Sequence, residues 1–142
     1  MKKSKSKKSP PKFIYRWVDK KILIVEDLEV NHMLIDRILQ RTSANLIWAM
    51  DGEEAVELCQ QHNDIDLVLM DIRLPKMNGY EATKRIRKFR NDLPIIAQTA
   101  YVMENNKHKV IDAGCNDLIT KPIDKNILLD KVHKYIMKNN KM

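Results

Sequence analysis

Five short apolar runs, separated by stretches with helical periodicity, limit most strongly what this chain can fold into. The runs cover residues 21–25, 45–49, 66–70, 94–98 and 117–120. Their length and their β-branched residues predict buried strands, and the stretches between them predict amphipathic helices. Strands that alternate with helices favour a five-stranded, doubly wound parallel sheet with helices on both faces. We therefore expect a single α/β domain.

Apolar spacing and capping residues define the expected helices. The first helix should bury one face, made of Val30, Met33, Leu34, Ile38 and Arg41. Asp51 and Asp124 are suitable N-caps for a helix that reaches residue 62 and for the last helix. A third helix is expected at residues 80–89, and a fourth should end at Ala113 before Gly114. The expected apolar stripe of the last helix consists of Ile127, Leu128, Val132 and Ile136.

Positive charge is concentrated at the start of the chain. The net charge is +7, and residues 1–20 hold eight Lys or Arg and one Asp, whereas the other residues hold 18 basic and 18 acidic side chains. Residues 1–18 are therefore predicted to be a basic, disordered tail or linker, and residues 19–142 the domain. A small nucleic-acid-binding protein is an alternative, but no recognition motif accompanies the tail, so we do not expect nucleic acid as a partner.

The rest of the composition argues against a secreted or membrane-embedded protein. Two cysteines, Cys59 and Cys115, are too few for a disulfide framework. No apolar run approaches the roughly 20 residues that a membrane-spanning helix needs. We expect a cytoplasmic protein with free thiols and no membrane contact of its own.

The residues able to do chemistry lie at the carboxyl ends of the predicted strands. Glu26 and Asp27 follow the first strand, Asp71 the third, Thr99 the fourth and Lys121 the fifth. Because the carboxyl ends of parallel strands share one edge, these groups can converge there. Three neighbouring carboxylates repel one another, and a hard cation such as Mg²⁺ (or Mn²⁺) would relieve that repulsion. Such a set can support phosphoryl transfer to an Asp.

Four motifs in this order resemble a known family. They are Ile24-Val25-Glu26-Asp27, the stretch 69–79 around Asp71, Gln98-Thr99-Ala100 and Thr120-Lys121-Pro122. Together they resemble the receiver domain of bacterial response regulators and hybrid histidine kinases, over about residues 21–138. The resemblance implies a flavodoxin-like (βα)5 fold. It also implies a signalling domain that assists its own phosphorylation and slow dephosphorylation, rather than an enzyme.

The resemblance also implies a role for each site residue. Asp71 would accept a phosphoryl group from the phosphohistidine of a histidine kinase or phosphotransfer protein. Glu26, Asp27 and the backbone carbonyl of Arg73 would join Asp71 in holding the metal. Thr99 and Lys121 would bond the phosphoryl oxygens. The peptide bond between Lys121 and Pro122 is expected to be cis, as in the family, and to aim Lys121 at the site.

Three positions bear on how the response would be regulated. Leu118 stands where the family often has an aromatic residue that moves with the threonine. We therefore expect a smaller or differently coupled change on the surface formed by the fourth helix, the fifth strand and the fifth helix. Arg73 and Tyr101 lie two residues beyond Asp71 and Thr99. Their bulk is expected to shield the acyl phosphate from water and lengthen its life.

Several alternatives remain open from the residues alone. Asp27 could simply cap the first helix, and Lys121-Pro122 could be an ordinary turn. An Asp-nucleophile hydrolase would typically carry a second Asp two residues after the first, where this chain has Arg73. The domain could also be an interaction module that works without phosphorylation. We expect a monomer or weak dimer, either a stand-alone phosphorelay protein or the terminal receiver of a hybrid kinase.

Overall fold

Five parallel strands form one sheet in the order β3-β2-β4-β5-β6 in a computed structural model, which describes residues 15–100 and 104–138. The chain makes β3 on one side of β2 and then crosses to make β4 on the other side. The strands are β2 (Lys21–Val25), β3 (Asn45–Ala49), β4 (Leu67–Asp71), β5 (Ile95–Thr99) and β6 (Asp117–Thr120). The predicted doubly wound parallel sheet is confirmed.

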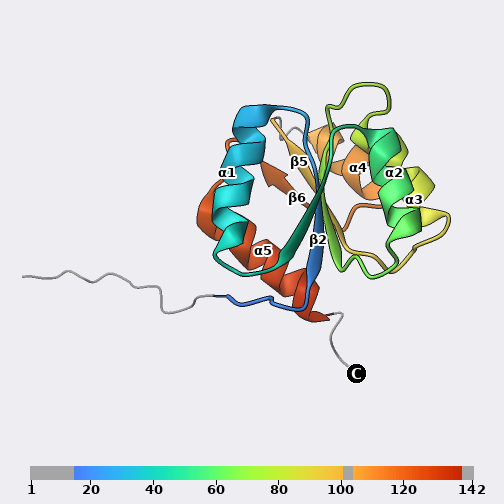
Figure 1. The fold of residues 1–142 in the computed structure, drawn as a ribbon. Coiled ribbons are helices and arrows are strands. Elements are labelled where there is room, and N and C mark those ends of the chain that lie inside the picture. The colour runs from blue at the N-terminus through green and yellow to red at the C-terminus, as the bar shows by residue number, and fades with distance from the viewer. Residues whose placement is uncertain (1–14, 101–103, 139–142) are drawn as a thin grey trace, which may run out of the picture.

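The five described helices cover the sheet in two layers (Figure 1). One face carries α1 and α5, and the other carries α2, α3 and α4. Their bounds are α1 (Glu29–Gln40), α2 (Gly52–Gln61), α3 (Gly79–Arg87), α4 (Glu104–Ala113) and α5 (Lys125–Lys138). Side chains of β2 alternate between the two resulting cores, with Ile22 and Ile24 in one and Leu23 and Val25 in the other.

The predicted buried face of α1 is wrong. Val30 is 74% exposed and Met33 is 56% exposed, whereas Ile35, Ile38 and Leu39 pack against the sheet. The helix carries two apolar stripes with the same spacing of three and four residues, and the more C-terminal stripe faces the core. Of the predicted set, only Ile38 is buried, while Arg41 is the C-cap.

The other helices follow the prediction more closely. Asp51 caps α2 by accepting a hydrogen bond from the Glu54 N–H, and Asp124 accepts one from the Ile127 N–H. The predicted stripe of α5 is correct except for Ile127, which is 48% exposed. The third helix begins at Gly79 and ends at Arg87, where residues 80–89 were expected. Every helix in the described parts of the chain is too short or too polar to cross a membrane.

Both cysteines are free and buried, as expected from their number. Burial raises the pKa of the Cys59 and Cys115 thiols to about 11. Since the thiolate is the reactive form, both side chains act as core residues here.

An aromatic contact ties the segment ahead of β2 to α5. Trp17 is 2% exposed, and its backbone N–H donates to the Thr42 carbonyl at 2.7 Å. Tyr15 stacks on His133 with ring centroids 4.3 Å apart, and its hydroxyl donates to Asp130 at 2.8 Å. Trp17 therefore packs on the domain, while the division at residue 18 stays a prediction.

Replacing Trp17 with Ala should lower the free energy of unfolding by about 3 kcal/mol, because a large buried aromatic leaves a cavity. Val18 is the matched control, since it is the next residue and is 56% exposed. Val18→Ala should change stability by less than about 0.5 kcal/mol. Urea unfolding followed by far-UV circular dichroism measures both. Equal stabilities for the two variants would mean that the segment is not part of the cooperative unit.

Candidate functional site

The predicted site residues converge where the strand order reverses. β2 and β4 are neighbours in the sheet, so Glu26 and Asp71 lie beside each other at its carboxyl edge. One carboxylate oxygen each from Glu26, Asp27 and Asp71 lies within 4.8 Å of the others. Crevices at such switch points are the usual ligand sites of open α/β sheets.

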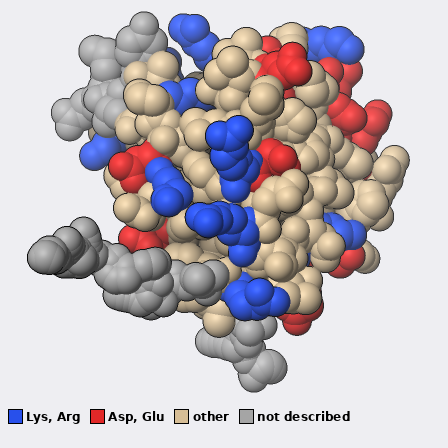
Figure 2. Space-filling model, turned by 60° about the vertical axis from the view of Figure 1, so that its left-hand side comes forward, with Lys and Arg blue, Asp and Glu red and all other residues tan. Residues whose placement is uncertain are grey.

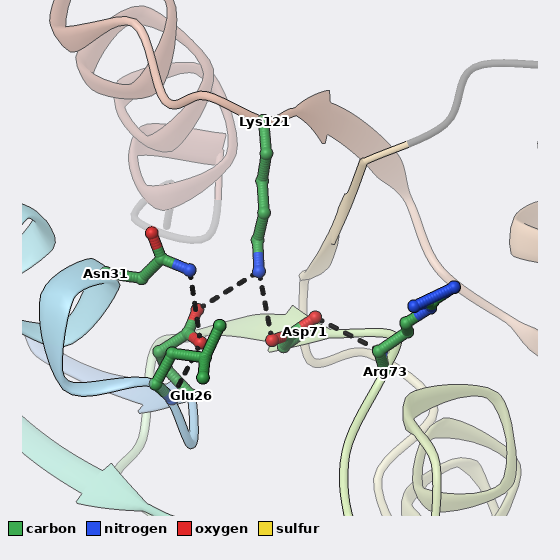
Figure 3. Close-up of polar contacts among 6 residues, drawn as sticks. Glu26, Asn31, Asp71, Arg73 and Lys121 are labelled. Carbon is green, nitrogen blue, oxygen red and sulfur yellow. Dashed lines mark hydrogen bonds and ion pairs between the residues drawn. The ribbon is translucent and has the colours of Figure 1, made fainter.

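Both oxygens of Asp71 are held by donors (Figure 3). Oδ1 accepts a hydrogen bond from the Arg73 backbone N–H at 3.1 Å, and Oδ2 accepts one from the Lys121 Nζ at 3.0 Å. Asp71 is 3% exposed, so these donors replace most of its hydration. The same ammonium lies 3.4 Å from Oε1 of Glu26 and thus bridges the two buried carboxylates.

Glu26 is the most deeply buried member of the acidic group, at 1% exposed. Its Oε2 accepts from the Leu28 backbone N–H at 3.1 Å, and the Asn31 side-chain Nδ2 lies 3.5 Å from the same atom. Burial, followed by the negative charge of Asp71, raises the pKa of the Glu26 carboxyl above its ordinary value. The Leu28 N–H and Lys121 oppose that rise.

Asp27 does not cap the first helix. The N-cap of α1 is Leu28, whose own side chain makes no capping hydrogen bond. The half-buried Asp27 instead lines a cleft of about 290 Å³. The full lining of the cleft is Glu26, Asp27, Leu28, Glu29, His32 and Met50. This observation removes the strongest alternative role for Asp27.

Close backbone packing fixes the segment after Asp71. A Cβ atom on Gly79 would lie 2.3 Å from the Asp71 carbonyl oxygen, so only glycine allows α3 to begin there. The Gly79 N–H donates to the Ile72 carbonyl at 2.9 Å, and the Ile72 N–H donates to the Gln98 carbonyl at 3.1 Å. The stretch 69–79 therefore needs its glycine because a side chain there would collide with the backbone after Asp71.

A backbone hydrogen bond also holds the segment that carries Lys121. The Lys121 backbone N–H donates to the Thr99 carbonyl at 2.8 Å, and the Lys121-Pro122 peptide bond is cis, as predicted. Thr99 ends β5 at the same edge and is 8% exposed. Leu118 is half-buried and packs against the core under α2, α3 and α4, while Tyr101 lies outside the described residues.

The donor set suits a hard divalent cation. Three carboxylates with neighbouring oxygens match the preference of Mg²⁺ for oxygen ligands. Oε1 of Glu26 is buried without a hydrogen-bond partner among the described residues, so the group has an oxygen left to satisfy. The Arg73 backbone N–H contacts the carboxylate of Asp71, while the role of the Arg73 carbonyl as a metal ligand stays a prediction.

Two contributors to the site were not predicted from the sequence. The Leu28 backbone N–H and Asn31 both approach the buried Glu26 carboxylate. His32, which lines the cleft, meets Trp48 edge to face, with ring centroids 3.6 Å apart. The sequence signal was that Leu28, Asn31 and His32 lie within five residues after Asp27.

Comparison with known proteins agrees with this architecture. The sequence model of the response regulator receiver domain matches residues 22–133. The chain is 33% identical over 119 residues to the polar-differentiation response regulator DivK of Brucella ovis, covering 82% of this chain and 96% of that protein. It is 39% identical over 113 residues to the autoinducer 2 sensor kinase/phosphatase LuxQ of Vibrio vulnificus, covering 79% of this chain. The chain spans only 13% of the length of that kinase.

Solved structures are similar to the whole domain. The receiver domain of sensor histidine kinase PA1611 from Pseudomonas aeruginosa, with magnesium in its active-site cleft, aligns with a TM-score of 0.77 and 34% identity. That alignment covers 82% of this chain and 97% of that one. The Ssk1 receiver of Saccharomyces cerevisiae, crystallised with the phosphotransfer protein Ypd1, aligns with a TM-score of 0.80 and 30% identity over 84% and 90% of the two chains.

The chain therefore belongs to the response regulator receiver domain family. It is a signalling domain that serves as a phosphoacceptor in a two-component phosphorelay.

The raised pKa of Glu26 makes metal-free stability depend on pH. An acid whose pKa rises on folding stabilises the fold when protonated, so its contribution is lost as pH rises from 4.5 through the raised value. Glu26→Gln is neutral at every pH and should melt above the wild type at about pH 7, with the gap closing by about pH 4. Excess Mg²⁺ should stabilise the wild type and reverse the order. Thermal melts in EDTA and in Mg²⁺ measure this, and a gap that does not vary with pH would contradict it.

Proposed function

We propose that Asp71 is the phosphoacceptor and that Glu26, Asp27, Asp71 and the Arg73 backbone carbonyl hold a magnesium ion. The carrying observation is the single ammonium of Lys121, which lies 3.0 Å from Asp71 and 3.4 Å from Glu26. Among the described residues, this one ammonium faces three carboxylates, so the site is anionic and a phosphoryl group could approach only with additional positive charge. When bound, the metal would supply that charge and polarise the phosphoryl oxygens.

In the proposed reaction, a carboxylate oxygen of Asp71 attacks the phosphorus of a phosphohistidine. The new O–P bond forms as the N–P bond breaks, and the electron pair leaves with the imidazole of the donor. Lys121 would then move its ammonium from the carboxylate to a phosphoryl oxygen, a shift that its flexible side chain allows. Thr99, at the end of β5, would donate its hydroxyl to another phosphoryl oxygen.

Intact-mass spectrometry after incubation with a small phosphodonor tests this proposal. Wild-type protein should gain one phosphoryl group in the presence of Mg²⁺ and none in EDTA. Asp71→Asn should gain none under either condition, because an amide oxygen cannot form the acyl phosphate. Glu26→Gln, which keeps Asp71, should be labelled at least about tenfold more slowly at low Mg²⁺.

Labelling of Asp71→Asn at the wild-type rate would remove Asp71 from the role. If the wild type gained no mass under conditions that label a known receiver, the domain would act without phosphorylation.

We also propose that water slowly hydrolyses the acyl phosphate at the same site, with Arg73 and Tyr101 limiting the access of water.

The exposed apolar stripe of α1 is the proposed docking surface for the phosphohistidine donor. Val30, Met33 and Leu34 are exposed by 74%, 56% and 38%, and they lie on the helix that begins beside the cleft. Exposed apolar groups that cluster beside a reactive site are typical of a protein interface. Figure 2 shows that Lys and Arg side chains gather in the middle of the face that carries α1 and α5. Such a surface fits a partner with an apolar patch rimmed by acidic groups.

Met33→Asp should slow phosphoryl transfer from a phosphorylated phosphotransfer domain by about tenfold, because a charge at the centre of an apolar contact costs more than about 1 kcal/mol. Its labelling by a small phosphodonor should stay at the wild-type rate. Ile111→Asp is the matched control, since Ile111 is 59% exposed on α4 of the opposite layer. The donor is one shown to label the wild type, and rapid-quench kinetics follow the transfer. Equal rates for both variants would place the docking surface elsewhere.

A further inference from the structure

We infer that Asn31 is a positioning residue for metal binding. By holding one oxygen of the Glu26 carboxylate, its amide leaves the other oxygen facing Asp71 and Lys121. The inference rests on the proposed metal site and concerns how the site is prepared for the ion. Nothing in the four receiver motifs includes Asn31, which stands in the first turn of α1.

The two oxygens of Glu26 have different surroundings (Figure 3). Asn31 reaches Oε2 from α1 on the side of Glu26 away from Asp71, with its Nδ2 at 3.5 Å. The Leu28 backbone N–H reaches the same oxygen at 3.1 Å. Oε1 has no hydrogen-bond partner among the described residues, and the Lys121 ammonium is 3.4 Å from it. Leu28 and Asn31 therefore both act on Oε2, whereas Oε1 lies beside the Lys121 ammonium.

This asymmetry selects a carboxylate orientation. The terminal torsion of a glutamate is broad, so a single backbone donor would leave the carboxylate considerable freedom. A second donor, placed on another element, narrows that freedom, and the oxygen opposite to both donors then points at the acidic group. Outer partners of metal ligands commonly act in this way, by orienting the ligand before the ion arrives.

The chemistry of the amide supports the assignment. Asn offers a donor NH₂ and an acceptor oxygen, and only the donor can approach a carboxylate favourably. Asn31 is half-buried, so its hydrogen bond is partly shielded from competing water. The distance of 3.5 Å lies at the long end for a hydrogen bond. We therefore expect the loss of Asn31 to weaken metal binding by no more than about tenfold, the lower end of the range for residues that orient metal ligands.

Calorimetric titration with Mg²⁺ alone tests the inference without any phosphorylation. Asn31→Ala should raise the Kd for Mg²⁺ by about three- to tenfold. Asn31→Leu should do the same, because Leu has a similar size but no donor. The metal-free melting temperature of Asn31→Ala should not fall, since Ala is a better helix former than Asn.

Gln40 offers a matched control on the same helix. Its side-chain amide is exposed and donates to Asp36, one turn before it and far from the site. Gln40→Ala should leave the Kd for Mg²⁺ unchanged. In phosphorylation by a small phosphodonor, Asn31→Ala should need more Mg²⁺ for half-maximal rate and reach nearly the wild-type rate at saturation.

Three outcomes would overturn the inference. Wild-type affinity in both Asn31 variants would remove Asn31 while leaving the proposed function intact. Wild-type affinity in Asn31→Leu alone would show that side-chain volume matters and the hydrogen bond does not. A wild-type protein that bound no Mg²⁺ would remove the proposed metal site together with the inference.

Discussion

Repulsion among three carboxylates at one edge of the sheet is the constraint on which the rest of the structure depends. Glu26 and Asp71 are almost fully buried, and the ammonium of Lys121 pairs with both of them. Without further constraint, the three carboxylates would reduce their mutual repulsion by moving apart or by taking up protons. The backbone prevents the first response, because β2 and β4 are paired neighbours and Gly79 packs directly on the Asp71 carbonyl.

Much of this arrangement could be predicted because it depends on chain topology. Apolar runs of four or five residues between helical segments leave few alternatives to a parallel sheet, and a parallel sheet brings Glu26, Asp71 and Lys121 to a common edge. Two strands, β4 and β5, lie one residue further along the chain than predicted. Asp71 and Thr99 end β4 and β5, whereas they were expected to follow those strands. Neither displacement moves the site.

What could not be predicted depends on tertiary contacts. Two apolar stripes with the same spacing run along α1, and periodicity alone cannot tell which stripe will face the sheet. Ile35, Ile38 and Leu39 meet β2 and α5 side chains in the core, and that complementarity exists only once the layers have assembled. The approach of Asn31 to Glu26 likewise depends on the angle at which α1 leaves β2, so no spacing rule reveals it.

The aromatic contact ahead of β2 has a mechanical consequence. Tyr15 and Trp17 contact α5 and the turn after α1, at the amino end of β2, whereas Glu26 follows the carboxyl end of that strand. A force applied to the chain ahead of Tyr15 would first load the stacked rings and the Trp17–Thr42 hydrogen bond. The strand that ends at Glu26 would carry tension only after those contacts had given way. A displacement of Tyr15 would therefore strain the aromatic contacts before it changed the geometry of the acidic group.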